Sequence, residues 1–296
     1  MAERVLVTGA NGFTGRYMVE RLRQQGCEVL QLDARIEPGQ PDQHLCDLCD
    51  REQTHRLLEQ LQPDRVVHLA GIAFVGHPNI DAIYRINIVA THHLLSALAK
   101  LPRPPAKVLL ASSANVYGNS LHDPIDEATP PNPANDYAVS KLAMEQMALL
   151  WCERLPIDLV RPFNYTGVGQ SDCFLLPKIV NHFRQGATEI ELGNLQVARD
   201  FSDVRTVVDA YARLLQVPAA ATVYNVCSGH ATYLSEVLQM MEEIAGYRVT
   251  VRQVKRYSRR NEVERLRGSN SRLVEAIGPL RETALQETLR WMYAAA

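Results

Sequence analysis

A glycine-rich turn near the amino terminus is the feature that most restricts how this chain can fold. An apolar run, Arg4–Thr8, leads directly into the glycine triplet of residues 9–15, and a helical pattern then continues to Gln25. Glycines permit a tight turn with close backbone approach, and the free N–H groups at a helix start attract a pyrophosphate. The segment therefore predicts a strand, a phosphate-binding turn and a helix, which together open a dinucleotide-binding sheet.

An acidic residue ends the second predicted strand. Asp33 follows the run Glu28–Leu32, about twenty residues after the glycines, where a carboxylate suits the 2′-hydroxyl of an adenosine ribose. The same carboxylate would repel the 2′-phosphate of NADP, so Asp33 favours NAD(H) as the cofactor. Arg35 follows closely and could accept that phosphate instead, which keeps NADP(H) as the alternative.

A tyrosine and a lysine at helical spacing predict acid-base chemistry. If residues 133–154 form a helix, Tyr137 and Lys141 lie one turn apart on the same face. A phenol has an ordinary pKa of about 10, and an adjacent ammonium lowers that pKa, so Tyr137 would become usable near neutral pH. Ser113, which follows the predicted strand Lys107–Ser112, adds a hydroxyl at the edge of the sheet where ligands bind. We refer to Ser113, Tyr137 and Lys141 as the reactive trio, and together they predict a site for hydride transfer.

Strands alternate with helical patterns through the first half of the chain. This alternation predicts an α/β fold with a Rossmann-like, doubly wound parallel sheet. We expect an NAD(P)-binding Rossmann domain over residues 1–162, joined by returning segments from about 200–228. Residues 163–296, where the pattern loosens, are expected to form mainly a smaller substrate-binding cap.

The composition agrees with a globular enzyme and disfavours other classes. The chain has 296 residues, of which 46% are hydrophobic and 22% are charged, enough to bury a full core. The net charge of −2 argues against nucleic acid as a partner, and no apolar stretch is long enough to predict a membrane span. Because no leader pattern is visible and the six cysteines are scattered, as is typical of reduced thiols, we expect a cytoplasmic protein without a metal site.

With these motifs in place, the sequence resembles the extended short-chain dehydrogenases/reductases that act on nucleotide sugars, the NAD-dependent epimerase/dehydratase family. The resemblance covers essentially the whole chain, and within the family the pattern is most similar to GDP-4-keto-6-deoxy-D-mannose reductases. It rests on the glycine loop, on His68-Leu69-Ala70-Gly71, on the reactive trio, on Arg161-Pro162-Phe163-Asn164 and on Arg199-Asp200-Phe201.

The resemblance also implies roles for residues that spacing alone does not identify. For the cofactor it implies contacts from Gly9, Asn11, Gly12, Phe13, Thr14, Gly15, Asp33, Arg35, Asp47, Leu48, Leu69, Ala70, Gly71, Asn87, Tyr137 and Lys141. For the substrate it implies contacts from Ser113, Asn115, Asn164, Arg199, Arg260 and Glu262. In the family, the residue matching Asp47 contacts the adenine, the one matching Asn164 contacts the diphosphate, and the one matching Arg199 holds the nucleotide end of the substrate.

Position 115 narrows the reaction. Family dehydratases carry a carboxylate there, and family epimerase-reductases acting at C3 and C5 carry a cysteine, whereas Asn115 cannot transfer a proton. The reactive trio then suffices for hydride transfer at one carbon. The resemblance to GDP-4-keto-6-deoxy-D-mannose reductases implies that the reaction is reduction of the C4 ketone of an NDP-4-keto-6-deoxyhexose, with GDP as the favoured nucleotide. The same trio would serve an NDP-sugar 4-epimerase with tightly bound NAD, and the fold alone also suits a non-catalytic dinucleotide-sensing module.

The resemblance further implies a homodimer. The family commonly pairs the helices that match residues 79–99 and 133–154, and here both stretches carry more apolar positions than one sheet-facing stripe requires. The alternative is that both helices are simply well buried within the monomer.

Overall fold

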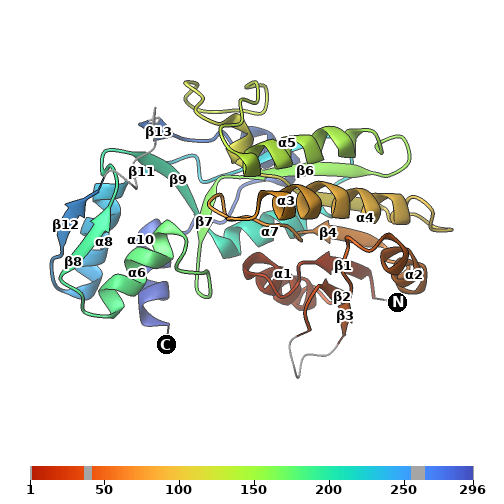
Figure 1. Cartoon of the computed structure of the whole chain (residues 1–296), viewed down its shortest axis with the longest axis horizontal. Helices are drawn as coiled ribbons and strands as arrows, with labels where there is room; N and C mark the ends of the chain where they lie inside the picture. Colours follow the sequence, from red (N-terminus) through yellow and green to blue (C-terminus); the bar gives the residue numbers. More distant parts are fainter. Residues whose placement is uncertain (1, 37–41, 255–263, 296) are drawn as a thin grey trace.

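The computed structural model describes residues 2–36, 42–254 and 264–295 of the chain. Its centre is a seven-stranded sheet in which neighbouring strands run parallel, in the order β10-β6-β5-β4-β1-β2-β3 (Figure 1). The strands are β1 (Arg4–Thr8), β2 (Glu28–Asp33), β3 (Gln43–Leu45), β4 (Arg65–His68), β5 (Lys107–Ala111), β6 (Ile157–Pro162) and β10 (Val223–Val226). The strand order reverses between β1 and β4, so the sheet is doubly wound and the predicted fold class is confirmed.

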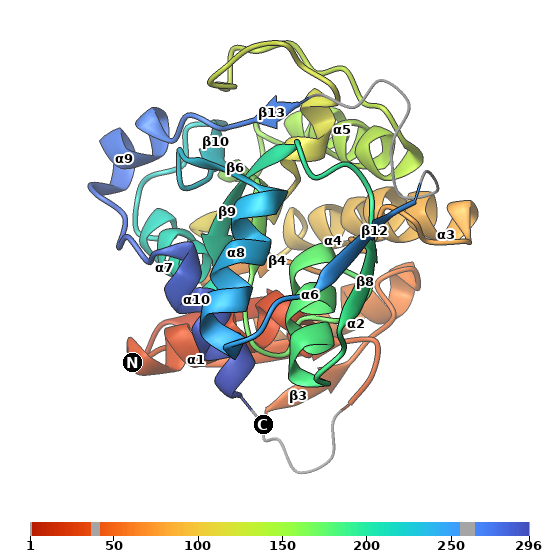
Figure 2. The ribbon, with the colours of Figure 1, turned by 90° about the vertical axis from the view of Figure 1, so that its left-hand side faces the viewer.

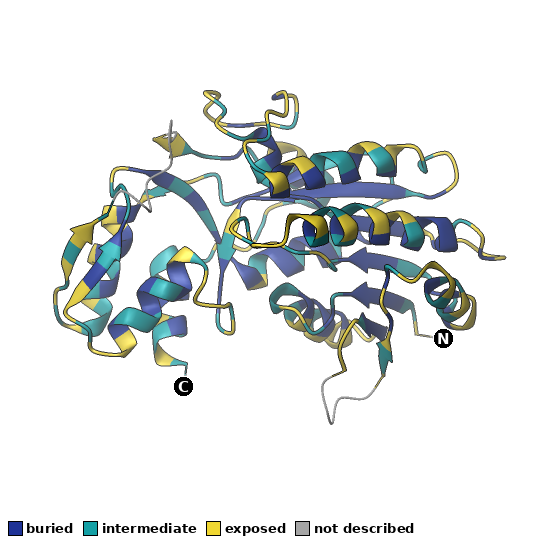
Figure 3. Ribbon diagram, in the orientation of Figure 1, coloured by how far each residue is buried: buried dark blue, intermediate teal, exposed yellow. Residues whose placement is uncertain are grey.

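Helices cover both faces of this sheet, and Figure 3 shows its strands as mostly buried. One face is covered by α1 (Phe13–Gln24), α7 (Val204–Leu214) and α9 (Ser271–Ile277), and the other by α2 (Arg51–Leu61), α3 (Ile80–Tyr84), η1 (Arg85–Ala90), α4 (Thr91–Leu98) and α5 (Asp136–Leu149). Successive strand residues point to opposite faces. Val5 and Val7 accordingly belong to the same buried cluster as Met18 of α1, whereas Leu6 belongs to the cluster of Leu94 in α4.

The long helix predicted over residues 79–99 is interrupted by one π-helical segment. η1 lies between α3 and α4 and carries Asn87, whose side chain is buried. The Asn87 amide donates to the carbonyl oxygen of Ile72, at 3.2 Å, and to Oγ of Ser140 on α5, at 2.9 Å. Such π-turns are frequent at functional sites, and this one ties the loop after β4 to the helix that carries Tyr137.

The carboxyl-terminal elements form a second layered unit beside the sheet (Figure 2). Three helices pack with a two-stranded sheet around their own buried cluster: α6 (Leu175–Arg184), α8 (Leu234–Ala245), α10 (Leu285–Ala294), β8 (Glu189–Leu192) and β12 (Thr250–Gln253). A further small sheet is built from β7 (Asn164–Thr166), β9 (Ala198–Asp203), β11 (Ala231–Tyr233) and β13 (Arg265–Leu266). α7 and β10, from the segment expected to return, lie with the large sheet. The division into a Rossmann domain over residues 1–162 and a cap over 163–296 stays a prediction.

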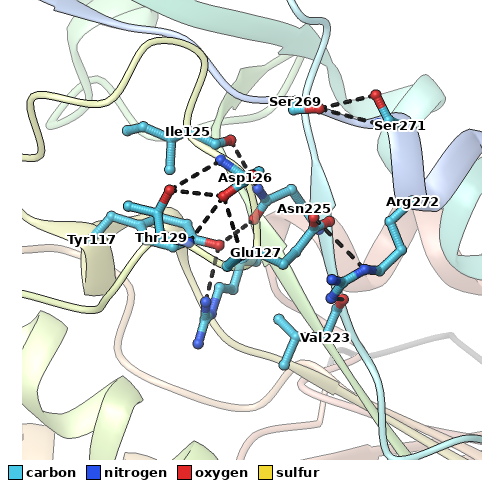
Figure 4. A network of polar contacts seen from close by, with 12 residues as sticks. Tyr117, Ile125, Asp126, Glu127, Thr129, Val223, Asn225, Ser269, Ser271 and Arg272 are labelled. Atoms are coloured by element: carbon cyan, nitrogen blue, oxygen red, sulfur yellow. Dashed lines mark hydrogen bonds and ion pairs between the residues drawn. The ribbon is translucent and has the colours of Figure 1, made fainter.

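A buried polar contact fixes the long loop that precedes α5. Asn225 of β10 accepts a hydrogen bond from the Tyr117 hydroxyl, at 2.8 Å, and donates to the carbonyl oxygen of Ile125, at 3.1 Å. Its backbone N–H also donates to Glu127, at 2.7 Å, and Figure 4 shows Asn225 between these partners. These hydrogen bonds hold the loop against β10, the outermost strand of the large sheet. Within the described ranges, no helix is both long and apolar enough to cross a bilayer.

Candidate active site

The glycine turn has the backbone geometry that only glycine allows at two of its positions. Gly9 has φ +68°, and a Cβ there would lie 2.7 Å from the backbone nitrogen of Ala70. A Cβ at Gly15 would lie 2.1 Å from the carbonyl oxygen of Gly9. Both distances are shorter than any tolerable contact, so side chains are excluded where β1 passes into α1. The predicted strand, turn and helix are confirmed.

The corner beyond the glycine turn contains Asp33 and two arginines. The Asp33 carboxylate accepts the backbone N–H of Asn11, at 3.1 Å, and that of Arg35, at 3.2 Å. Asn11 is also contacted by Arg16, whose Nε donates to the Asn11 carbonyl oxygen at 3.0 Å. Arg16 and Arg35 are both exposed. The sequence analysis did not select Arg16, although its position one residue after the glycine triplet is a usable signal.

A cavity of about 460 Å³ brings the glycine loop and the reactive trio together. It opens at the carboxyl ends of the parallel strands, where ligands of such sheets bind. The sequence-predicted residues that line it are Gly9, Gly12, Phe13, Thr14, Gly15, Leu69, Gly71, Ser113, Asn115, Tyr137, Lys141 and Asn164. The cavity is large enough for a small-molecule ligand and carries both apolar walls and a few polar groups.

Other predicted residues lie behind or beyond this lining. Leu48 is buried, whereas the neighbouring Asp47 side chain is exposed and accepts the backbone N–H of Cys49 at 2.9 Å. Ala70 donates its N–H to the Thr8 hydroxyl at 3.2 Å. Arg199, on β9, donates to the carbonyl oxygen of Ala198 at 2.9 Å. The remaining substrate candidates, Arg260 and Glu262, lie outside the described residues.

The reactive trio comes from two elements that meet at the cavity. Ser113 follows β5 and caps the short helix η2 (Ala114–Tyr117), while Tyr137 and Lys141 lie one turn apart on α5 as predicted. All three are buried. α5 begins later than the predicted residue 133, because the Asn135 side chain caps the helix by accepting the N–H of Ala138 at 2.9 Å. It also ends at 149, since the chain continues in turns.

Burial changes the acid-base properties of the tyrosine and the lysine. Burial raises the pKa of Tyr137 to about 12, although the hydrogen bond with Ser113 lowers it. Burial lowers the pKa of Lys141 to about 8, although the nearby Glu145 carboxylate raises it. The Lys141 ammonium donates to the carbonyl oxygen of Ala111, at 2.8 Å. The sequence predicted a lowered pKa for Tyr137, and this prediction is wrong because desolvation of the buried phenol dominates.

A buried ion pair lies directly behind the trio, and the sequence analysis missed it. Glu145 is one turn beyond Lys141 on α5 and receives two hydrogen bonds from Arg161 of β6, at 2.9 and 2.6 Å. Ser112, the neighbour of Ser113, donates to the same carboxylate. The spacing of Glu145 from Lys141 was a visible signal, since residues four apart share a helix face. The pair links α5 to the ends of β5 and β6 and so holds the two halves of the trio in place.

Residues 5–227 match the NAD dependent epimerase/dehydratase family. The chain belongs to this family. The family predicted from the sequence and its enzyme class, the extended short-chain dehydrogenases/reductases, are therefore confirmed.

Several relatives align over nearly their full length. The chain is 36% identical to GDP-6-deoxy-D-mannose reductase of Pseudomonas aeruginosa, over 98% of this chain and 96% of the relative. Among solved structures, a candidate epimerase from Burkholderia cenocepacia J2315 is 50% identical with a TM-score of 0.94, covering 99% of both chains. The structure of RMD from Pseudomonas aeruginosa complexed with NADPH is 34% identical with a TM-score of 0.86, covering 99% of this chain and 97% of that one.

Proposed function

We propose that this epimerase/dehydratase family member reduces the C4 ketone of an NDP-4-keto-6-deoxyhexose, with GDP as the nucleotide. The observation that carries the proposal is the gathering of Ser113, Tyr137 and Lys141 with the glycine loop around one cavity. The Pseudomonas relative named as a GDP-6-deoxy-D-mannose reductase supports the substrate class. Asn115 at the cavity wall supports reduction over dehydration, since a side-chain amide cannot act as a general acid or base at neutral pH.

The fit of the cavity to a reduced nicotinamide dinucleotide rests on the glycine loop. Gly9, Gly12 and Gly15 line the cavity at the start of α1, where free backbone N–H groups would bind a pyrophosphate. When bound, NADH or NADPH supplies the hydride. Asp33 favours NADH, while the exposed Arg16 and Arg35 provide positive charge for the 2′-phosphate of NADPH, which is the cofactor in the RMD structure.

The trio divides the remaining work among its members. With its pKa raised to about 12, Tyr137 keeps its proton at neutral pH and donates it to the C4 oxygen as charge develops there. Ser113 donates a hydrogen bond to the same oxygen. Lys141, with a pKa of about 8, is mostly protonated at neutral pH and holds the cofactor ribose. Asn164 is assigned to the nucleotide diphosphate and Arg199 to the nucleotide end of the substrate. Arg260, assigned to the diphosphate, and Glu262, assigned to the substrate, lie beyond the described residues.

A 4-epimerase is the second candidate function. The same trio would oxidise and re-reduce C4 with a cofactor that stays bound, and the similarity to the Burkholderia candidate epimerase favours keeping this alternative. A non-catalytic sensor would bind the dinucleotide without turnover.

Two incubations separate the three candidate functions. Purified protein is mixed with GDP-4-keto-6-deoxymannose and NADH or NADPH, and the absorbance of the reduced nicotinamide is followed. Net oxidation of the cofactor supports the reductase. In the second incubation the protein is given bound NAD and an NDP-sugar with a hydroxyl at C4, and formation of the C4 isomer without net reduction of the cofactor supports the epimerase. If neither incubation gives a product, the non-catalytic sensor remains.

We also propose that the protein is a homodimer. α3, η1 and α5, which the resemblance assigns to the interface, expose apolar side chains to solvent in the single chain: Ile80, Val89, Val139, Leu149 and Leu150, the last of which follows α5 directly. Solvent-exposed apolar groups on adjacent helices favour an interface over simple burial in the monomer. The six cysteines are unpaired, which supports the reducing environment of the cytoplasm as the compartment.

A further inference from the structure

The hydroxyl of Ser113 is contacted twice by one neighbouring residue. The backbone N–H of Asn115 donates to Ser113 Oγ at 3.1 Å, and the side-chain Nδ2 of Asn115 donates to the same atom, also at 3.1 Å. Ser113 is 5% exposed and Asn115 is partly exposed at the cavity wall. The backbone N–H and the side-chain amide of Asn115 thus both donate to the serine oxygen.

These two contacts limit the further hydrogen bonds that the Ser113 hydroxyl can form. A serine hydroxyl has one proton to donate and two lone pairs to accept with. Both lone pairs are engaged by Asn115, so the proton is the group that Ser113 has left for a partner in the cavity.

We propose that Asn115 is a positioning residue that holds Ser113 as a hydrogen-bond donor toward the reacting oxygen. The inference deepens the proposed function and rests on it, since the acceptor in turnover is the C4 oxygen of the substrate. A carbonyl oxygen that gains negative charge needs donors already in place. By supplying two donors to the serine oxygen, Asn115 removes the alternative in which Ser113 accepts a hydrogen bond and turns its proton away.

A carboxylate at this position would reverse the arrangement. It has nearly the same shape as the amide but, when ionised, only accepts hydrogen bonds. The Ser113 proton would then turn toward the introduced carboxylate and away from the cavity. The competing explanation is that the Asn115 side chain only contacts the substrate, as the family resemblance implies, and this explanation makes no reference to Ser113.

The decisive test is a double-mutant cycle with Asn115→Asp and Ser113→Ala, measured as kcat and KM at about pH 8. We expect Asn115→Asp to lower kcat by about 10²-fold in the wild-type background, as for loss of one oxyanion donor, with a smaller effect on KM. In the Ser113→Ala background the same substitution should cost less than about threefold, because the serine it acts through is absent. Equal losses in both backgrounds would overturn the proposal and favour a direct substrate contact.

The pH dependence gives a second, independent readout. The ratio of Asn115→Asp to wild-type kcat should rise as the pH is lowered from about 8 toward 5, because the introduced carboxyl takes up a proton and regains a donor. Tyr137 and Lys141 of α5 and Tyr165 of β7 also line this part of the cavity, and the wild-type profile measures their contribution. Asn132→Asp, which adds the same charge on an exposed loop, is the matched control and should keep the wild-type profile. A ratio that does not change with pH would contradict the proposal.

A measurement without turnover keeps the inference separate from the proposed function. If wild-type protein oxidises no cofactor with any 4-keto-6-deoxy nucleotide sugar, the proposed function fails. The ¹⁵N spectrum still decides on Asn115, since Ser113→Ala should shift both its backbone and its side-chain N–H resonances. A shift of the backbone signal alone would mean that the side chain does not contact Ser113, and the positioning role would be wrong. Should Asn115→Asp fail to fold, Asn115→Ala replaces it in the cycle, with the same non-additivity expected.

Discussion

The imidazole of His68 lies 2.7 Å from the hydroxyl of Thr8, with Nδ1 facing Oγ1. Thr8 also accepts the backbone N–H of Ala70. On the other side, His68 Nε2 lies 2.9 Å from the Thr91 hydroxyl, whose proton goes to the carbonyl oxygen of Asn87. The chain of hydrogen bonds therefore fixes one neutral tautomer of His68, with the proton on Nε2, and links β1 to the helix that contains η1.

This buried neutral histidine predicts a pH dependence of stability. Burial, with a smaller contribution from the Lys141 ammonium, lowers the pKa of His68 from 6.5 to about 3. The unfolded chain therefore binds one more proton than the folded chain between these values, and the free energy of unfolding falls as the pH drops below about 6.5, by up to about 1.4 kcal/mol per pH unit. His68→Gln, which can still accept and donate, should remove this slope in urea titrations between pH 4 and 7. The exposed His122→Gln is the control, and an unchanged slope in His68→Gln would contradict the expectation.

Removing the Tyr137 hydroxyl should abolish most turnover while sparing cofactor binding. Tyr137→Phe deletes the proposed proton donor but does not touch the glycine loop, so we expect kcat to fall by about 10²-fold or more with a nearly unchanged dissociation constant for NADH. Tyr247→Phe removes a hydroxyl that instead bonds the carbonyl oxygen of Phe183, at 2.9 Å, and should behave as wild type. Turnover by Tyr137→Phe within a few-fold of wild type would sink the acid role.

The preference between NADH and NADPH should depend on the charges of Asp33, Arg16 and Arg35. We expect NADH to bind more tightly than NADPH in fluorescence titrations, because the Asp33 carboxylate accepts from a free hydroxyl and repels a phosphate. Arg35→Ala and Arg16→Ala should each weaken the binding of NADPH by about tenfold and the binding of NADH much less. Arg23→Ala, further along α1 and equally exposed, is the control. Tighter binding of NADPH by the wild type would mean that the two arginines outweigh Asp33.

Light scattering tests the dimer. The wild-type protein should have twice the 33.2 kDa mass of one chain at micromolar concentration. Val89→Asp places a charge on the exposed apolar surface of η1 and should shift the mass toward one chain, because an unpaired charge in an interface is costly. Leu121 lies on a loop outside α3, η1 and α5 and is more exposed than Val89, so Leu121→Asp should leave the mass unchanged. A wild-type mass of one chain would refute the dimer.

The features that the sequence could predict depend on local pattern. The run of strand, glycine turn and helix at residues 4–24 needs no tertiary information, because glycine is required by the backbone itself. The helical spacing of Tyr137 and Lys141 likewise follows from one element. The sequence also predicts that Tyr137 and Lys141 lie near Ser113, because ligands of parallel sheets bind at the carboxyl ends of the strands.

The features that escaped prediction depend on how separate elements pack. Glu145 and Arg161 are distant in the sequence, and only the adjacency of α5 and β6 makes them an ion pair. The pKa of Tyr137 was predicted with the wrong sign, because the spacing of Lys141 indicates a charge nearby but not the desolvation of the phenol. The role proposed for Asn115 depends on the backbone conformation of η2. This helix has only four residues, which is too short for a sequence periodicity to predict it.

The most direct test of the proposed reaction follows the hydride itself. NADH or NADPH carrying deuterium at C4 of the nicotinamide, prepared separately for each face, is reacted with GDP-4-keto-6-deoxymannose, and the product is examined by mass spectrometry and proton NMR. The proposed function predicts one deuterium per sugar, located at C4, from one of the two labelled cofactors, and a loss of labelling in Tyr137→Phe that parallels its loss of turnover. Deuterium at another carbon, or product formed without deuterium from either cofactor, would contradict it.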